Sequence, residues 1–166
     1  MGDPKRHRKK YETPRHPWRA EVLAEELKLL GEYGLRNKRE LWRVAATLRK
    51  YRTIARSLFV LSGEERKEKE RSLIGKLARL GVLPPTATLD DVLRLTVRDF
   101  LERRLQSVVY KLGMATSIHH ARQLIVHGHV FVGDKKVRSP SYHVMAGEER
   151  LIKVLLPQLA KQEGSS

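Results

Sequence analysis

The most informative stretch of this chain is residues 103–144, which read RRLQSVVYKLGMATSIHHARQLIVHGHVFVGDKKVRSPSYHV. Apolar residues recur at helical intervals from Leu101 to Leu112, and Gly113 stands where a left-handed helix cap is expected. A second helix is predicted between Ser117, whose hydroxyl can cap its start, and Gly128, which can end it. The pattern therefore predicts two short helices in succession.

A hairpin is predicted directly after the second helix. Residues 129–132 alternate in polarity, residues 133–134 are the turn-forming pair Gly-Asp, and residues 136–138 resume an extended, cationic pattern. Two helices and a hairpin together predict a small module that binds RNA. Its candidate RNA contacts are the basic and hydrogen-bonding side chains outside the apolar positions: Arg103, Arg104, Lys111, Ser117, His119, His120, Arg122, Gln123, His127, Lys136, Arg138 and Tyr142.

Three of these candidates, Arg103, Arg104 and Lys111, are predicted to lie off the buried stripe of the first helix, facing a polyanion. Substitution of Arg104 or Arg122 by alanine is therefore expected to weaken RNA binding and to change the melting temperature little, whereas Leu105→Ala is expected to unfold the module.

Residues 103–144 resemble the S-four (S4) RNA-binding domain. The hallmark of that family is a leucine-rich helix ending in glycine, a serine-capped helix ending in His-Gly, and a valine-rich hairpin followed by Pro-Ser-Tyr. The matching residues of this chain are Arg104, Leu105, Gly113, Ser117, Ala121, Arg122, Ile125, Gly128, Val130, Val132, Val137, Pro140, Ser141 and Tyr142. Many members carry Asn-Gly where this chain has Gly133 and Asp134, and either pair suits a tight turn.

The length of the chain argues against an enzyme. The same domain occurs on pseudouridine synthases and tyrosyl-tRNA synthetases, but outside the module only about 100 residues remain, which is short for either catalytic domain. No glycine-rich phosphate loop, nucleophile elbow or His-Glu-x-x-His motif occurs in the sequence. We therefore expect no catalysis, no cofactor and no small-molecule substrate.

The charge of the chain points to nucleic acid. The sequence holds 34 Lys and Arg against 19 Asp and Glu, which gives a formal net charge of +15. Neutralising phosphates releases condensed counterions, so a surface this basic binds RNA or DNA with a steep salt dependence. The hydrophobic content of 40% still permits a folded core.

Composition also predicts the compartment. No apolar run approaches the roughly 18 residues of a membrane-spanning helix, and no signal-peptide core follows Met1. The sequence has no cysteine, which excludes disulfides and fits a reducing compartment. We expect a cytoplasmic protein without a membrane partner. The absence of cysteine and the single asparagine, Asn37, hint at a heat-adapted source.

Residues 1–17 are predicted to form an extended basic arm, because prolines interrupt any helix there. A solvated, disordered tail is the alternative. The ring of Tyr11 can stack on a splayed base or pack on the next helix, and Trp18 is expected to pack. The candidate RNA contacts of the arm are Lys5, Arg6, Arg8, Lys9, Lys10, Tyr11 and Arg15.

Residues 18–95 are predicted to form a helical domain whose first helix starts at Pro17. A long second helix starts at Asn37, which forms a capping-box-like pair with Glu40. Its polar face is dense in arginine, which suits phosphate recognition. The candidate contacts there are Arg36, Lys38, Arg39, Arg43, Arg49, Arg52 and Arg56. Further capping boxes are predicted for Ser62 with Glu65, Thr88 with Asp91, and Thr96 with Asp99.

The expected fold class is α+β: a mainly helical N-terminal domain with a basic extended arm, followed by a compact module of two or three helices packed on a small antiparallel sheet. The predicted division is an arm over 1–17, a helical RNA-binding domain over 18–95, an S4 domain over 96–156 and a flexible tail over 157–166.

The N-terminal half carries a second resemblance. The stretches GDPKRHRKKYETPRHPW (2–18) and EYGLRNKRELWR (32–43) are similar to the start of the archaeal and eukaryotic branch of the small-subunit ribosomal protein S-four family. That resemblance implies a structural protein that binds the five-prime domain of 16S-type rRNA early, nucleates assembly of the subunit body and contributes to translational accuracy. It also implies contact with neighbouring ribosomal proteins, notably S-five. The cysteine cluster of many bacterial members does not carry over.

Four closely spaced histidines invite a zinc site, namely His119, His120, His127 and His129. Histidine-only structural zinc sites are unusual and adjacent histidines of a helix diverge, so we expect no metal and favour hydrogen bonds to RNA. The rival functions are a stand-alone RNA chaperone, a subunit of a pre-rRNA processing complex, a specificity subunit that delivers RNA to a separate enzyme, and a basic peripheral membrane protein.

Overall fold

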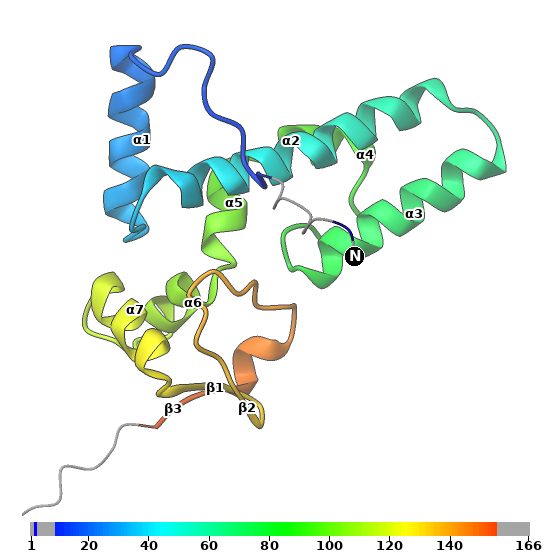
Figure 1. Cartoon of the computed structure of the whole chain (residues 1–166). Coiled ribbons are helices and arrows are strands. Elements are labelled where there is room, and N and C mark those ends of the chain that lie inside the picture. The colour runs from blue at the N-terminus through cyan, green and yellow to red at the C-terminus, as the bar shows by residue number, and fades with distance from the viewer. Residues whose placement is uncertain (1, 3–8, 156–166) are drawn as a thin grey trace, which may run out of the picture.

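The computed structural model describes residue 2 and residues 9–155. The chain runs through a helical part and then a smaller mixed part (Figure 1). The elements are α1 (Ala20–Glu32), α2 (Lys38–Val60), α3 (Glu64–Arg79), α4 (Leu89–Arg94), α5 (Val97–Glu102), α6 (Leu105–Lys111), α7 (Ile118–His127), β1 (Val130–Val132), β2 (Lys135–Lys136), the 3-10 helix η1 (Glu148–Leu151) and β3 (Ile152–Val154). The expected α+β class is confirmed. The predicted flexible tail over 157–166 lies outside the described residues.

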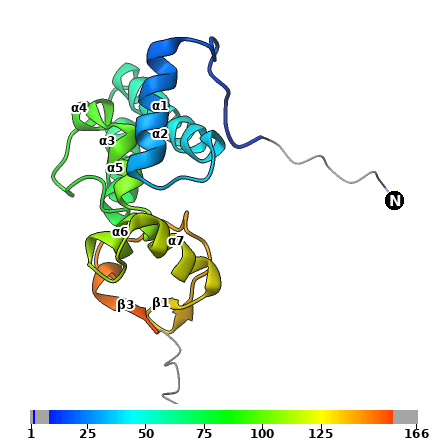
Figure 2. The ribbon, with the colours of Figure 1, turned by 90° about the vertical axis from the view of Figure 1, so that its left-hand side faces the viewer.

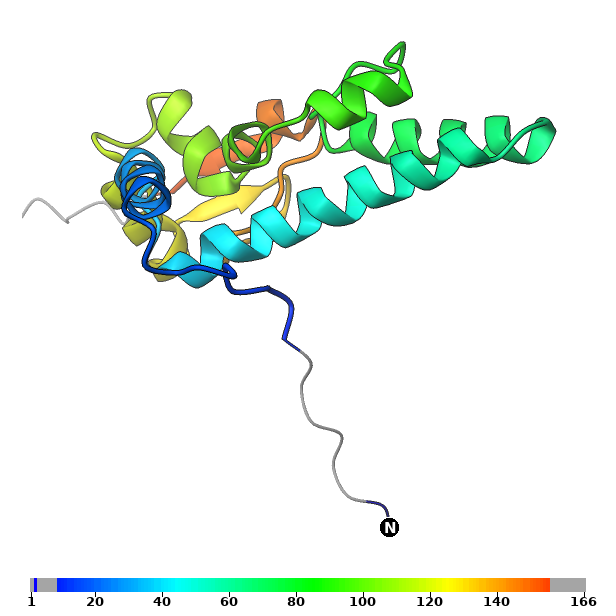
Figure 3. The same cartoon turned by 90° about the horizontal axis from the view of Figure 1, so that it is seen from above.

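Helix α2 is the central rod of the helical part. Helices α1, α3, α4 and α5 all contact it, and α3 runs back alongside it as the second arm of a hairpin (Figure 3). Apolar residues of α2 recur every three or four positions from Leu41 to Leu58, so one stripe of the helix is buried. The first apolar cluster consists of Leu35, Leu41, Val44, Leu48, Ala55, Leu58, Leu73, Leu77, Leu89, Val92, Leu95, Phe100 and Leu101.

The start of α2 follows the prediction in part. The Asn37 side chain caps the helix, since its Oδ1 accepts a hydrogen bond from the Glu40 backbone N–H at 3.2 Å. The Glu40 carboxylate, however, bonds to two arginines of the C-terminal part. The Asn37 cap is therefore confirmed. The Glu40 side chain, however, does not complete the capping box and instead forms long-range ion pairs.

The predicted helix starts are correct at two other places and wrong at two. Thr88 with Asp91 and Thr96 with Asp99 form the capping boxes that begin α4 and α5. Helix α3, by contrast, has Gly63 at its N-cap without a side-chain cap, so the predicted Ser62–Glu65 box is wrong. The Glu65 carboxylate instead pairs with a lysine one turn further on. Helix α1 begins at Ala20, later than predicted.

The mixed part places two helices on one three-stranded antiparallel sheet of order β2-β1-β3 (Figure 2). Ser117 caps α7 by accepting the His120 N–H at 3.1 Å, and Gly128 ends it at φ 78°. These caps and the predicted hairpin are confirmed. The second apolar cluster consists of Leu105, Val108, Val109, Ala115, Ala121, Leu124, Ile125, Val130, Val132, Val144 and Ile152.

The predicted first helix of the module is divided in two. Leu101 belongs to α5 and to the first cluster, whereas Leu105 belongs to α6 and to the second cluster. Between them Arg104 takes an extended conformation (φ −73°, ψ 143°) as the N-cap residue of α6, and its backbone bridges to His143. The apolar periodicity runs across the break because both helices bury the same kind of side chain. The two cores meet between residues 101 and 105.

Candidate nucleic-acid interface

The arm is anchored to α2 at two points within the described residues. The Tyr11 ring stacks on Trp42, with ring centroids 6.1 Å apart and planes inclined by 29°. One residue further on, Glu12 forms an ion pair with Arg49. Of the two roles expected for Tyr11, its ring packs on a helix of the protein, α2, in this structure. Lys9, Lys10 and Arg15 are exposed, and the candidates Lys5, Arg6 and Arg8 lie outside the described residues.

Trp18 does not pack as expected. Its side chain is 87% exposed, so the prediction that it would pack beneath the first helix is wrong. The reason is that α1 begins after it, at Ala20, and turns its half-buried residues toward α2 rather than back toward the arm.

The arginines of α2 divide into exposed and engaged side chains. Arg36, which precedes the helix, is exposed, as are Arg39, Arg43, Arg49 and Arg56. Lys38 is half-buried and lies 3.0 Å from Glu26, and Arg52 donates to the Leu95 carbonyl at 2.5 Å. The exposed residues can meet a phosphate backbone directly, whereas Lys38 and Arg52 fasten α2 to its neighbours.

Glu40 joins the two parts of the molecule. Its Oε2 accepts a hydrogen bond from Arg104 Nη2 at 2.6 Å, and its Oε1 accepts one from Arg122 Nη2 at 2.7 Å. Burial raises the pKa of Glu40, but the hydrogen bonds from both arginines outweigh burial and hold the pKa below its ordinary value. A single carboxylate of α2 thus binds the start of α6 and the side of α7.

Gln106 extends this seam. Its side chain is fully buried, and its Nε2 donates to the carbonyls of Gly34 at 3.0 Å and Ile118 at 3.1 Å. Its Oε1 accepts a hydrogen bond from Arg122 at 3.3 Å. Because buried amide groups are costly to leave unpaired, this network fixes the loop before α2 against α7.

Arg104 is not available to a polyanion. Its residue is only 3% exposed, so the prediction that it would lie on an outward face is wrong. Arg103 is half-buried and donates to the carbonyls of Leu80 and Val144, each at 3.0 Å, and pairs with Glu149. Both side chains hold the start of α6 in place, because the division of the predicted helix turns this segment into the junction between the two cores.

The remaining candidates of the module lie mostly on its surface. His119, Gln123, His127, Lys136 and Arg138 are exposed, and Ser117 is exposed although its hydroxyl is used as a cap. Lys111 is exposed and pairs with Glu102 at 3.0 Å. His120 is half-buried with its Nδ1 3.0 Å from the Thr116 hydroxyl, and the half-buried Tyr142 donates to Glu148 at 3.1 Å.

Two cations of the hairpin converge on the end of α7. A side chain placed on Gly128 would come within 2.3 Å of Lys136 Cε and 3.1 Å of Arg138 Nε. Gly128 also has a positive φ of 78°, which favours glycine. The helix end and the return strand therefore form one basic surface around Gly128.

Sequence reasoning missed the residues that hold the two parts together. Glu40 was read only as a helix cap, and neither Gln106 nor Trp42 was singled out. A signal for Gln106 exists, since it is a polar residue inside an apolar run, between Leu105 and Val108. Nothing in the sequence indicates that Glu40 and Arg122, 82 residues apart, are partners.

Two further findings concern residues 2 and 9–155. No group of three or more His, Cys, Asp or Glu side chains there is placed to hold a metal ion. In the same residues, no helix is both long enough and apolar enough to cross a membrane.

Comparison with known proteins agrees with the geometry of the module. The family model described as "S4 domain" matches residues 103–149, which include α6, α7 and the hairpin. The chain thus contains an S4 domain, the RNA-binding class that its helices and hairpin define.

The similarity to known proteins extends over the helical part as well. The chain is 58% identical over 152 residues to "Small ribosomal subunit protein uS4" of Ignicoccus hospitalis, covering 92% of each chain. It is 56% identical to the protein of the same name from Hyperthermus butylicus, covering 92% of this chain and 86% of the relative. The protein from Saccharolobus solfataricus is 51% identical, with 99% of this chain and 96% of the relative covered. The chain belongs to the small ribosomal subunit protein uS4 family.

Proposed function

We propose that this protein is a structural component of the small ribosomal subunit that binds the subunit's rRNA. The observation that carries the proposal is that Glu40 joins α2, which carries exposed arginines, to the S4 domain, whose cations gather around Gly128. The relatives are small ribosomal subunit proteins by name, which supports the ribosomal context.

The proposed mechanism is electrostatic. Converging rRNA helices repel one another, and guanidinium groups placed between them neutralise phosphates and release counterions. Because the major groove of A-form RNA is too narrow for side chains, recognition runs mainly through shape, phosphates and ribose hydroxyls. A fixed angle between the two basic surfaces then selects one geometry of the RNA junction.

The proposed division of labour follows the four predicted segments. The arm over 1–17 and the helical domain over 18–95 bind one side of the junction, and the S4 domain over 96–156 binds the other. The contact residues proposed on exposure are Lys9, Lys10, Arg15, Arg36, Arg39, Arg43, Arg49, Arg56, Lys111, His119, Gln123, His127, Lys136 and Arg138. Arg104 and Arg122 act as positioning residues behind this surface.

The finer assignments rest on the family resemblance. They are binding to the five-prime domain of 16S-type rRNA, nucleation of the subunit body, a contribution to decoding accuracy, contact with the neighbouring protein S-five, and a place in cytoplasmic ribosomes. A structural role without catalysis is part of the same proposal.

The test is binding to a five-prime-domain rRNA fragment and to an unrelated RNA of equal length, at two salt concentrations. Specific binding that persists at the higher salt supports the proposal. Equal affinities that fall together with salt would leave only a general cationic binder and favour the RNA-chaperone alternative. The processing-complex alternative predicts the protein on precursor rRNA and its absence from translating subunits.

A matched pair of variants separates interface from bulk charge. Arg39→Gln with Arg43→Gln removes two exposed charges from the proposed interface, whereas Lys28→Gln with Arg71→Gln removes two exposed charges elsewhere. The first pair should weaken specific binding by at least about tenfold more than the second. Equal effects would contradict the assignment of the α2 surface.

A further inference from the structure

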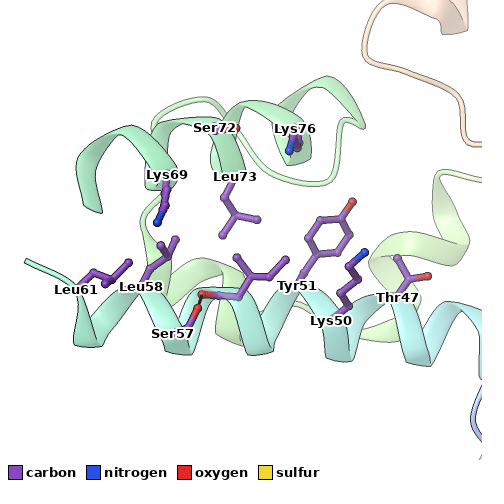
Figure 4. Close-up of a pocket in the computed structure, with 11 residues that line it drawn as sticks. Thr47, Lys50, Tyr51, Ser57, Leu58, Leu61, Lys69, Ser72, Leu73 and Lys76 are labelled. Atoms are coloured by element: carbon purple, nitrogen blue, oxygen red, sulfur yellow. Dashed lines mark hydrogen bonds between the residues drawn. The ribbon is translucent and has the colours of Figure 1, made fainter. Parts of the chain in front are cut away.

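A cleft lies between α2 and α3, on the hairpin that projects from the helical part (Figure 4). Its volume is about 550 Å³. The residues lining this α2–α3 cleft are Thr47, Lys50, Tyr51, Ile54, Ser57, Leu58, Leu61, Lys69, Ser72, Leu73 and Lys76. None of them belongs to the proposed rRNA contacts.

The floor of the cleft is apolar. Leu58 and Leu73 point into it from the two helices, and Tyr51 points from α2 toward α3 (Figure 4). Ile54 also lines it. Leu58 and Leu73 belong to the first core, while Ile54 and Tyr51 remain half-buried. Apolar side chains of a partner would therefore meet a surface already held in place by core packing.

The rim of the cleft is cationic. Lys50 on α2 and Lys69 and Lys76 on α3 are exposed and stand around the apolar floor. Lys69 pairs with the exposed Glu65, whereas none of the residues lining the cleft is acidic. The cleft thus combines an apolar floor with an excess of positive charge at its edges.

Two exposed apolar residues lie near the tip of the hairpin, outside the set of residues that line the cleft. Val60 is 86% exposed and Phe59 is 41% exposed at the end of α2, next to Leu61 of the cleft. The Arg66 guanidinium lies over the Phe59 ring at 5.8 Å from its centroid.

The composition of the cleft favours a protein ligand over RNA. Tyr51 already stacks on Phe100, with centroids 5.8 Å apart, so one face of the ring is unavailable to a base. The exposed Arg56 precedes Leu58 by two positions, which is about 200° around the helix, so it faces away from the cleft. RNA bound to Arg56 therefore leaves the cleft open.

We infer that the α2–α3 cleft is a docking site for an acidic amphipathic segment of a partner protein. The apolar side chains of that segment lie on Ile54, Leu58 and Leu73, and its carboxylates meet Lys50, Lys69 and Lys76. Two or three side chains spaced along one face of a helix fill a groove of this kind.

The experiment uses the full chain and a synthetic helical peptide with leucines on one face and glutamates on the other. Binding is followed by fluorescence anisotropy, with the same peptide carrying lysine in place of glutamate as a charge control. The glutamate peptide should bind and the lysine peptide should not. Equal binding of both peptides, or of neither, overturns the proposal.

Two variants test the location of the peptide. Lys50→Glu with Lys76→Glu reverses the charge of the cleft rim, and Ser72→Trp fills the cleft from an exposed position on α3. Each variant should lower the affinity for the glutamate peptide by about tenfold. Lys28→Glu with Lys153→Glu, and Ala24→Trp, are the matched controls, at exposed positions outside the cleft. Unchanged affinity in both cleft variants overturns the proposal, even if one of them is less stable.

A competition experiment separates the cleft from the rRNA surface. The rRNA fragment should leave the peptide bound, and the cleft variants should retain rRNA affinity. Displacement of the peptide by the RNA would overturn the separate protein site and assign the cleft to RNA. If the parent protein bound the peptide but not the rRNA fragment, the proposed function would be contradicted and the cleft proposal would still hold.

Discussion

Glu40 and Arg104 form an ion pair of 2.6 Å that crosses from the helical part to the S4 domain. Arg104 is almost completely buried, and Glu40 is largely so. Replacing such a pair by apolar residues can be neutral, but removing one member leaves an uncompensated buried charge. The pair therefore stabilises one arrangement of the two parts more clearly than it stabilises the fold as such. Arg122, on the same carboxylate, reinforces that arrangement.

Stability should fall in acid because of Glu40. Its pKa is lowered in the folded protein, so below its ordinary value of 4.5 the unfolded chain binds more protons than the folded one. The free energy of unfolding therefore falls as pH falls from about 4.5 through the lowered pKa, and the contribution is fully present above that window. Urea unfolding at a series of pH values measures the effect, and Glu40→Gln should lose this part of the pH dependence.

His143 supplies a second window and an internal control. Burial, with a smaller contribution from Arg104, lowers the pKa of His143 below its ordinary value of 6.5. Stability should therefore also fall as pH drops below 6.5, and this loss should persist in Glu40→Gln. A Glu40→Gln protein whose acid profile below about pH 4.5 matches the parent would contradict the assigned role of the carboxylate.

Arg104→Ala should destabilise the protein, in contrast to the expectation from sequence. Loss of this side chain leaves Glu40 with one arginine and opens a cavity at the seam, at a cost of about 3 kcal/mol in the free energy of unfolding. Arg138→Ala, at an exposed position, should change stability by less than about 0.5 kcal/mol and weaken RNA binding. Chemical denaturation and RNA titration of both variants measure the two effects.

An Arg104→Ala protein as stable as the parent, with weakened RNA binding, would restore the outward-facing interpretation. Leu105→Ala serves as the reference for a purely apolar loss, because its side chain is fully buried in the second core.

Local rules predicted the parts of this fold that depend on local chemistry. The cap of Ser117, the boxes at Thr88 and Thr96, and the left-handed Gly128 all follow from interactions between residues at most four positions apart. Ser62 failed as a cap because the neighbouring Gly63 occupies the N-cap position instead. The spacing of residues in the sequence does not show which of two adjacent residues will occupy the N-cap position.

Long-range partnerships were beyond those rules. Arg104 fits the polar side of an amphipathic pattern, and only the fold brings Glu40, 64 residues away, to its guanidinium. The exposure of Trp18 has the same origin, since an apolar ring is expected to be buried unless the chain leads it away from every core. Candidate RNA contacts on α2 were easier to predict, because one face of that helix must be buried and arginines fill the rest.

Gly34→Ala should be strongly destabilising. Gly34 has φ 55°, and a Cβ there would lie 2.9 Å from both Gln106 Nε2 and Ile118 Cγ2. The left-handed backbone and the crowding of the seam together cost about 2 kcal/mol or more. Gly31→Ala is the matched control, because it lies in α1 with open space around its Cα and should be neutral or stabilising by up to about 1 kcal/mol. Thermal unfolding of the two variants should therefore shift in opposite directions or by clearly different amounts.

Arg49 and Arg56 should differ in their effect on RNA binding although both are exposed arginines of α2. Arg56→Gln removes one phosphate contact, so it should weaken binding similarly for all RNA sequences and reduce the slope of log K against log salt by about 1. Arg49→Gln also removes the partner of Glu12, which anchors the arm beside the Tyr11–Trp42 stack. Arg49→Gln should therefore reduce the slope of log K against log salt by more than the loss of one phosphate contact does, because the basic arm loses its fixed position. Glu12→Gln releases the arm and removes no cation, so a slope equal to that of the parent would show that the anchor does not direct the arm to RNA.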